Sequence, residues 1–271
     1  MIGSLYLEIA RTCTLNCEHC LRGDRRPIHM SKETIDNVFG GVMGIQRLLL
    51  SGGEPLLAIN QIKYILEVIK RKGTSISEIL IVTNGTVLSD EIIETLMELS
   101  RVAKIRISIS DDIFHQLELE RLGLMERRNE NIRILQELPE EKFGISKYNF
   151  GTVTNATIIP QGKAKNLTKE RLDEINSKYS TKYCIGSSSN AAWEWHRLPG
   201  CQNGYLVGGE LAIDVNGNVT GYDLSYDQED AMAQEGNFNV NDIGLTNAVI
   251  NFSTWYRELG KEEAQHKASK G

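Results

Sequence analysis

The 271-residue sequence lacks several features that would assign it to a specialised class of protein. It has no apolar run long enough to span a bilayer, and its first residues lack the basic segment of a signal peptide, so we expect neither export nor a membrane partner. Its formal net charge of −6 argues against extensive nucleic-acid binding. With 41% hydrophobic and 24% charged residues, the composition is that of a soluble globular protein.

The sequence also lacks a disulfide framework. It has five cysteines, an odd number, and three of them cluster near the start. This usage predicts a protein of the reducing cytoplasm. A disulfide between the remaining Cys184 and Cys201 is the alternative, and the absence of an export signal disfavours it.

The clustered thiols lie in the run Cys13-Thr-Leu-Asn-Cys17-Glu-His-Cys20. Thiolates bind zinc or iron–sulfur clusters, but a structural zinc site normally needs four protein ligands and this run supplies three. Three thiolates suit a four-iron cluster with one iron left open for a ligand that is not protein. The alternative is a zinc site completed by Cys184, Cys201 or a histidine, which would leave the later Gly-Gly-Glu-Pro turn unexplained.

Apolar segments alternate with helical periodicity in the first half of the chain. Strands are predicted at 4–10, 45–50, 79–83 and 105–110, and helices from Ser31, over 59–72, over 89–101 and over about 114–138. This alternation predicts an α/β fold with a parallel sheet that is covered on both faces. The polar segments that follow the strands should meet at the strands' C-terminal ends, namely the cysteine loop, SGGEP at 51–55, TNGT at 83–86 and SISDD at 108–112.

The alternation weakens beyond residue 140. One or two further strands are predicted within 150–160, and a helix over 167–179. The segments ELAIDV and NVTGY flank Asn216-Gly217, which is a strong hairpin signal. We therefore expect a small C-terminal β-hairpin and helix cap, followed from Lys261 by a frayed tail.

The cysteine spacing, followed by Gly52-Gly53-Glu54-Pro55 after the second predicted strand, resembles the radical S-adenosylmethionine (radical SAM) superfamily. This resemblance implies a partial (β/α)6 TIM-like barrel at 1–165, a cap at 166–260 and a flexible tail at 261–271. It implies that Cys13, Cys17 and Cys20 hold one [4Fe-4S] cluster and that SAM chelates its open iron. The implied activity is reductive cleavage of SAM to methionine and a 5′-deoxyadenosyl radical, which abstracts a substrate hydrogen. An electron donor such as a flavodoxin or ferredoxin is the implied partner.

The resemblance also implies a cofactor site on the strand ends. Gly52, Gly53 and Glu54 would meet the methionine amino group, because glycines allow close approach of the backbone and a carboxylate accepts from an ammonium. Taken alone, SGGEP is more often an ordinary strand-to-helix turn. The other implied cofactor contacts are His19, Asn84, Ser108, Ser110 and Ile158, the last beside Ile159 in a wall for adenine.

Some members of the family have a Ser-x-Asp-x-aromatic-His run after the fourth strand, which makes Asp112 and His115 candidates on the substrate side. The alternative is a helix cap, favoured for Asp111, with a surface histidine. Positions in the core are favoured over the mouth of the site for Trp193, Trp195 and His196.

Cys201, GELAIDVNGNV and EGNFNVNDIG resemble the SPASM or twitch extension of peptide-modifying members. Tyr222 stands where that extension usually has a cysteine, and two cysteines do not hold a [4Fe-4S] cluster in the usual way, so we predict a cap without an auxiliary cluster. Cys184 and Cys201 are then plain buried thiols, or one of them donates a hydrogen atom to the substrate radical, as in the family's peptide epimerases.

The predicted function is modification of a ribosomally made peptide, by epimerisation, cross-linking or a related reaction. A small molecule or nucleotide is the alternative substrate. A tight pocket lined by Lys or Arg would favour the alternative, and an open groove beside a sheet edge would favour a peptide. The alternative from another class is a non-catalytic metal-binding regulatory protein.

Overall fold

The computed structural model gives the fold over most of the chain and describes residues 1–147, 153–154, 157–186, 197–221 and 224–269. The interpretations of four residues lie outside this described part: Trp193, Trp195, His196 and Tyr222.

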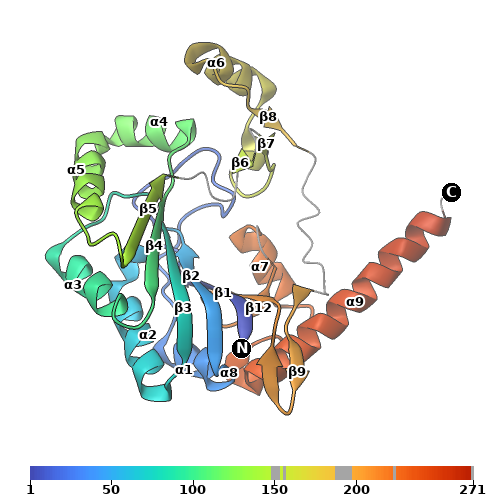
Figure 1. Ribbon diagram of the computed structural model, residues 1–271. Coiled ribbons are helices and arrows are strands. Elements are labelled where there is room, and N and C mark those ends of the chain that lie inside the picture. The colour runs from blue at the N-terminus through green and yellow to red at the C-terminus, as the bar shows by residue number, and fades with distance from the viewer. Residues whose placement is uncertain (148–152, 155–156, 187–196, 222–223, 270–271) are drawn as a thin grey trace.

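The centre of the protein is a sheet with strand order β12-β11-β1-β2-β3-β4-β5 (Figure 1). Its strands are β1 (Ile2–Ala10), β2 (Gly44–Gly52), β3 (Ser75–Thr83), β4 (Lys104–Ile109), β5 (Phe143–Lys147), β11 (Glu210–Ile213) and β12 (Val219–Thr220). Neighbours from β11 to β5 are parallel, and β12 is antiparallel to β11. The predicted α/β fold with a parallel sheet is confirmed. Over the described residues the sheet stays open, with β12 and β5 as edges, rather than closing into a barrel.

The sheet's strands are apolar because side chains on both faces are covered. In β1, Leu5, Leu7 and Ile9 are fully buried, and Ile79 and Ile81 of β3 are buried in the same way. Figure 1 shows the helices that follow the first three strands side by side along the outside of the sheet: α1 (Lys32–Gly40), α2 (Ile59–Lys72) and α3 (Asp90–Leu99).

The ends of these helices follow from local chemistry. Ser31 caps α1 by accepting from the Thr34 N–H, and Ser89 caps α3 by accepting from Ile92. α2 ends at Gly73, whose φ of 65° is the left-handed conformation that glycine adopts without strain. The helical region predicted over about 114–138 is confirmed, but it is divided, because Gly123, at φ 66°, ends the first part. Two helices result, α4 (Ile113–Leu122) and α5 (Met125–Gln136).

The remaining elements are short apart from two helices. They are the 3-10 helices η1 (Pro55–Ala58) and η2 (Ala164–Asn166), the strands β6 (Val153–Thr154), β7 (Thr157–Ile158), β8 (Cys184–Ile185), β9 (Gly200–Gln202) and β10 (Tyr205–Val207), and the helices α6 (Lys169–Tyr179), α7 (Tyr226–Met232), α8 (Val240–Ile243) and α9 (Leu245–Ser269). α9 extends into the segment from Lys261 for which the sequence predicts a frayed tail.

The predicted C-terminal hairpin is confirmed. Strands β11 and β12 pair antiparallel around Asn216-Gly217, with Ile213 opposite Val219. The hairpin joins the main sheet, because β11 lies parallel to β1, with Leu5 opposite Leu211. The C-terminal part of the chain therefore forms one edge of the same sheet as the first strand.

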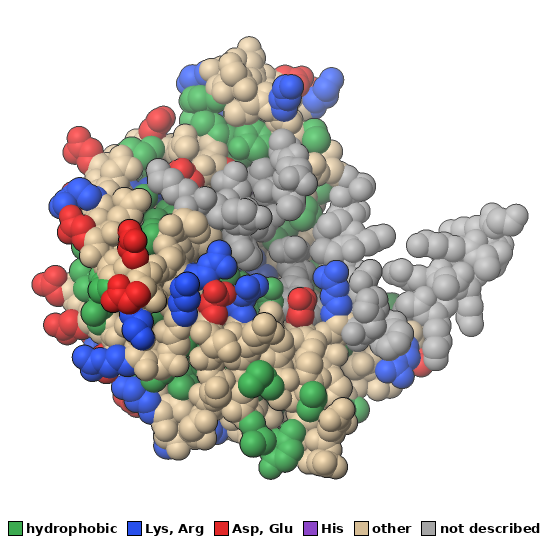
Figure 2. Space-filling view, in the orientation of Figure 1, with side chains coloured by type: hydrophobic (Ala, Val, Ile, Leu, Met, Phe, Trp, Pro, Cys, Tyr) green, Lys and Arg blue, Asp and Glu red, His purple; other side chains and the backbone are tan. Residues whose placement is uncertain are grey.

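The helical side of the molecule carries charges of both signs. Figure 2 shows blue and red side chains interspersed over the region of α3 and α5. Exposed ion pairs account for this pattern, among them Lys70–Glu98 and Arg133–Glu130. Among the described residues, no helix has both the length and the apolar character needed to cross a membrane.

Candidate active site

One cavity lies at the C-terminal ends of the parallel strands, where the four polar segments were predicted to meet. The cysteine loop after β1 contributes Cys13, Cys17 and Cys20 to its lining. The predicted convergence is confirmed by the further lining residues Gly52, Gly53, Thr83, Asn84, Ser110 and His115. A second wall comes from the C-terminal part of the chain, with Ala212, Ile213, Thr220, Gly221, Tyr226 and Glu229.

The three thiols of the cysteine loop lie close enough to affect one another's ionisation. Burial raises the pKa of Cys13 to about 12, and the Glu54 carboxylate adds to the rise. Burial also raises the pKa of Cys17, with further contributions from Cys20 and Cys13. The neutral forms of Cys13 and Cys17 are therefore favoured without a metal, and the positive charge of a bound metal ion reverses this preference.

The Gly52-Gly53 turn packs directly against the start of the cysteine loop. The N–H groups of Gly53 and Glu54 donate to the carbonyls of Ala10 and Thr12 at 2.8 and 2.7 Å. A Cβ at Gly52, where φ is 139°, would lie 1.9 Å from the Ala10 oxygen, and one at Gly53 would lie 2.3 Å from the Thr12 oxygen. Only glycine lets the two segments approach this closely.

The Glu54 side chain is a structural brace within the described site. It is fully buried and accepts from the Leu56 N–H at 3.1 Å, the Thr83 hydroxyl at 2.8 Å and the Asn84 N–H at 2.8 Å. Burial raises its pKa to about 7, and the donors from Asn84, Thr83 and Leu56 oppose that rise. It ties η1 to the end of β3 and is absent from the cavity lining, so its contact with an ammonium stays a prediction.

The predicted cofactor contacts at later strand ends divide into two groups. Asn84 and Ser110 line the cavity, and the Asn84 amide lies 3.6 Å from the Cys13 sulfur and 3.0 Å from the Thr14 hydroxyl. Ser108 and Ile158 are buried and are absent from the cavity lining, and Ile158 packs in a cluster with Phe114. The strand ends thus bring two of the four residues to the cavity surface.

Arg128, a buried side chain that ties two strand ends together, was not predicted from the sequence. Its guanidinium donates to the carbonyls of Asn84 at 3.1 Å and Ser110 at 2.8 Å, and it pairs with Asp111 at 2.8 Å. The Asn131 amide, one turn further along α5, donates to the Gly85 carbonyl. The polar positions 128 and 131 on the inward face of α5 were the available signal. Asp111 is therefore a partner of Arg128, and the prediction that it caps the helix is wrong.

Asp112 is the residue that caps α4, and it also holds two histidines. It accepts from the His115 N–H in the backbone and from Nδ1 of the same residue at 2.7 Å, and it lies 3.2 Å from His19 Nε2. Burial opposes ionisation of Asp112, but the two histidines outweigh it and hold its pKa well below the usual value.

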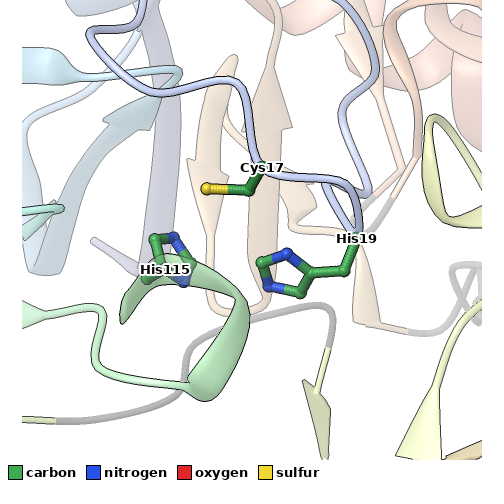
Figure 3. A group of neighbouring side chains, drawn as sticks. All are labelled: Cys17, His19 and His115. Carbon is green, nitrogen blue, oxygen red and sulfur yellow. The ribbon is translucent and has the colours of Figure 1, made fainter. Parts of the chain in front are cut away.

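Figure 3 shows how His19 and His115 lie beside Cys17. The rings of the two histidines meet edge to face, 5.0 Å apart, and one potential ligand atom from each of the three residues lies within 4.8 Å of the others. Because the group shares Cys17 with the cysteine loop, it is part of the same site and not a separate metal centre. Among the residues that the structure describes, the buried His19 Nδ1 has no hydrogen-bond partner.

A turn after β7 closes the other side of the cysteine loop. The Lys163 N–H donates to the Cys20 carbonyl at 2.9 Å, and the Lys163 ammonium donates to the backbone and side-chain oxygens of Asn16. A Cβ at Gly162 would lie 2.1 Å from the Leu21 oxygen. The sequence predicts that a strand ends in this segment, but it does not predict the contact of the segment with the cysteine loop.

Comparison with known proteins identifies the family. The model of the radical SAM superfamily matches residues 7–161, which is more than half of the chain. The chain belongs to the radical SAM superfamily. It is therefore an enzyme of that family, whose cofactors are a [4Fe-4S] cluster and SAM.

Radical SAM relatives match this chain over limited segments. The chain is 36% identical over 91 residues to a "Probable GTP 3′,8-cyclase" of Methanothermobacter marburgensis, covering 32% of this chain and 29% of that protein. It is 29% identical over 147 residues to a GTP 3′,8-cyclase of Peptoclostridium acidaminophilum (51% and 43%) and 33% identical over 112 residues to an AdoMet-dependent heme synthase of Methanosarcina barkeri (39% and 30%). The matched segments thus span less than half of each relative.

Two solved structures show a more distant likeness. SuiB of Streptococcus suis bound to the precursor peptide SuiA aligns with a TM-score of 0.44 at 13% identity, covering 93% of this chain and 64% of SuiB. The structure of anSMEcpe with bound AdoMet and the Cp18Cys peptide aligns with a TM-score of 0.45 at 15% identity, covering 92% and 80%.

The residues of this radical SAM site fit the family's cofactors. Three thiols share one loop and one cavity, which matches the three-thiolate ligand set of a cluster with an open iron. Gly52 and Gly53 line the cavity beside the thiols, and their lack of side chains lets the turn lie against the cysteine loop. The buried, unpartnered His19 Nδ1 supplies a polar atom that a ligand can satisfy.

The two cysteines outside the radical SAM motif lie apart from this cavity lining. Cys184 is on β8, with its sulfur 3.8 Å from the Thr157 hydroxyl, and Cys201 is on β9 opposite Leu206. Both are exposed and both are free thiols, so the prediction of buried thiols is wrong and the alternative of a disulfide between them is not realised. A role as hydrogen-atom donor stays a prediction for each.

Proposed function

We propose that this radical SAM enzyme modifies a ribosomally made peptide by abstraction of a hydrogen atom. The observation that carries the proposal is the composition of the cavity, because its two walls come from two parts of the chain. One wall holds the three cysteines, and the other is built from β11, β12 and α7. The segment that supplies the second wall is the one whose sequence resembles the extension of peptide-modifying members.

The residues of the first wall bind and orient the cofactors. Cys13, Cys17 and Cys20 would hold three irons of a single cluster, and the Gly52-Gly53 turn, Asn84 and Ser110 would line the place of SAM. When bound, the cluster and SAM supply the 5′-deoxyadenosyl radical that abstracts the hydrogen. Leu49 and Val82 at the cavity wall would keep water away from the reacting carbon.

His115 is the candidate on the substrate side, and Asp112 positions it. Because Asp112 accepts from His115 Nδ1, the other ring nitrogen is left for a ligand in the cavity that His115 lines. Asp112 itself is buried and absent from the lining, so it acts through the histidine.

Cys184 or Cys201 is the proposed donor of a hydrogen atom to the substrate radical, which would make the reaction an epimerisation. The thiyl radical left on the cysteine would return to the thiol by taking one electron from the proposed electron donor and one proton from water. Both thiols are exposed and free. Replacing the donor by alanine should abolish product and leave 5′-deoxyadenosine formation intact. Full product formation by both single variants would exclude this role, while modification by another route would remain compatible with the peptide substrate.

A small molecule or nucleotide is the second candidate substrate. It is favoured by the guanidiniums of Arg11, Arg22 and Arg25 among the cavity-lining residues and by the GTP cyclase names of two relatives. The peptide is preferred because Arg11 and Arg22 are already paired with buried carboxylates and so offer little charge to a phosphate.

Deuterium transfer distinguishes the two substrates. The anaerobically reconstituted enzyme should bind about four irons per chain and release 5′-deoxyadenosine under a strong reductant. It is then given either deuterated peptides translated from short reading frames next to its gene or deuterated GTP, and the 5′-deoxyadenosine is analysed by mass spectrometry. Deuterium from the peptide arm supports the proposal, and deuterium from the GTP arm alone overturns it.

We further propose a flavodoxin or ferredoxin as electron donor and a reducing cytoplasm as the compartment. Both follow from the chemistry, because the cluster requires low-potential electrons and the five cysteines of the described chain are free. Turnover with reduced flavodoxin in place of a chemical reductant tests the first of these.

A further inference from the structure

A network of buried charges joins α7 to the cysteine loop. The guanidinium carbons of Arg11, Arg22 and Arg26 lie 4.7, 4.8 and 5.5 Å from the centre of the Tyr226 ring. All three arginines belong to residues 11–26, the segment that carries Cys13, Cys17 and Cys20. Tyr226 is the first residue of α7, so one aromatic ring receives three cations from the loop that would hold the cluster.

Carboxylates of α7 complete these contacts. Glu229 accepts from Arg11 at 3.0 Å and from Arg22 at 2.8 Å. Asp230 accepts from Arg11 at 2.7 Å and also pairs with Arg26. The three arginines around Tyr226, which are Arg11, Arg22 and Arg26, are therefore each bound to a carboxylate of α7.

Backbone contacts reinforce the side chains. The Tyr226 N–H donates to the Arg22 carbonyl at 2.9 Å, and the Arg22 guanidinium donates to the Leu224 carbonyl at 2.6 Å. Glu8, at the end of β1, accepts from Arg11 at 2.9 Å and pairs with Arg22. The network thus spans the strand before the cysteine loop, the loop and α7.

Burial makes it costly to remove a single partner from this network. Arg11 is 1% exposed and Glu229 is 2% exposed, so the loss of one partner leaves a charge away from water. The loop must then move to bring its arginine to solvent or must keep an unpaired charge. The first response displaces the segment that carries the thiols, and the second makes its native position less stable.

We propose that α7 is a positioning element of the cluster site: Tyr226, Glu229 and Asp230 hold the arginines of the cysteine loop and thereby fix the three thiols. α7 belongs to the C-terminal part, outside the matched family domain of residues 7–161. The proposal does not depend on which substrate the enzyme takes. Iron release and the cluster spectrum test it, whereas deuterium transfer tests the peptide proposal, so the two proposals can fail separately.

The test uses reconstituted full-length protein and two substitutions at one position. Tyr226→Leu removes the aromatic face, whereas Tyr226→Phe keeps it. Tyr226→Leu should release iron to a chelator about tenfold faster than the unaltered protein, as expected when an outer support of a metal site is removed. Its reduced cluster should give an altered electron paramagnetic resonance spectrum and a shifted midpoint potential. Tyr226→Phe should retain the original values.

Glu229→Gln tests the carboxylate of the same helix and should change iron release and the spectrum in the same direction as Tyr226→Leu. The matched control is Glu98→Gln, which alters an exposed carboxylate of α3 that pairs with Lys70 and Arg101. It should change neither the iron-release rate nor the spectrum. Apo-protein unfolding curves show whether each variant folds. If the buried variants do not fold, Asp230→Asn, at a carboxylate that is 41% exposed, replaces them with the same expected direction.

Two results would overturn the proposal. One is the original iron-release rate and spectrum in folded Tyr226→Leu and Glu229→Gln, or in Asp230→Asn where it replaces them. The other is equal damage by Tyr226→Phe and Tyr226→Leu, because the ring face would then not be what holds the arginines.

Discussion

The contact between the Gly52-Gly53 turn and the cysteine loop is the part of the site most sensitive to one added carbon atom. In Gly53→Ala the new Cβ would lie 2.3 Å from the Thr12 oxygen, and contacts below 3.0 Å are not tolerated. The turn and the loop must separate by about 0.7 Å to reach 3.0 Å. A displacement of about 1 Å at a reacting centre costs about a hundredfold in rate, so we expect a loss of tenfold to a hundredfold.

The assay follows 5′-deoxyadenosine formation and SAM affinity in the reconstituted enzyme. Gly52→Ala should be more damaging than Gly53→Ala, because its Cβ would lie 1.9 Å from the Ala10 oxygen at a φ of 139°. Gly144→Ala on β5 is the control, since its Cβ would lie 3.6 Å from Arg106 in ordinary contact. Equal SAM affinity and activity in Gly53→Ala and Gly144→Ala would refute the reasoning.

Three further predictions concern groups around the cavity. Arg128→Met should lower the unfolding free energy by about 3 kcal/mol, because it removes the donor from two buried carbonyls. Urea unfolding measures this loss, and Arg127→Met at the exposed neighbouring position is the control that should have little effect. Asp112→Asn keeps an α4 cap but removes the carboxylate shared by two histidines, so substrate turnover should fall about tenfold while helix content is unchanged by circular dichroism. Because burial raises the folded-state pKa of Glu54 to about 7, the folded apo-protein binds more protons than the unfolded chain, and its stability should fall between about pH 4.5 and 7 by up to about 1.4 kcal/mol per pH unit. Urea unfolding at several pH values should show a steeper fall in stability across this range in the unaltered chain than in Glu54→Gln, in which other buried carboxyls such as Glu229 still contribute.

The sequence was informative wherever the signal was local. The apolar strands, the cap at Ser31, the stop at Gly73 and the Asn-Gly hairpin each depend on a few adjacent residues, and each agrees with the structure. The cysteine spacing and the glycine turn predicted which strand ends would meet. The break at Gly123 was missed because helical periodicity continues on both sides of it.

Contacts between distant segments were not predictable in this way. The polar residues Arg128 and Asn131 on the inward face of α5 signal buried hydrogen bonds, but their backbone carbonyl partners on distant strand ends leave no mark in the side-chain pattern. The pairing of β11 with β1 joins segments at opposite ends of the chain, so it depends on the topology of the whole sheet. The arginines around Tyr226 likewise read as ordinary turn residues until α7 is placed against them.

These distant contacts mean that the boundary predicted near residue 165 should not separate an autonomous cluster-binding unit. A chain ending at residue 165 would lose β11, the parallel neighbour of β1. Of the four carboxylates that pair with Arg11, it would also lose Asp214, Glu229 and Asp230 and keep Glu8 alone. A buried guanidinium without its partners is costly, and an uncovered edge of a sheet invites aggregation. We therefore expect the fragment 1–165 to aggregate, or to bind fewer irons than the full chain after identical reconstitution, as measured by size-exclusion chromatography and iron content. A monomeric fragment that retains the full chain's iron content and cluster spectrum would show that the cysteine loop is ordered by the family domain alone.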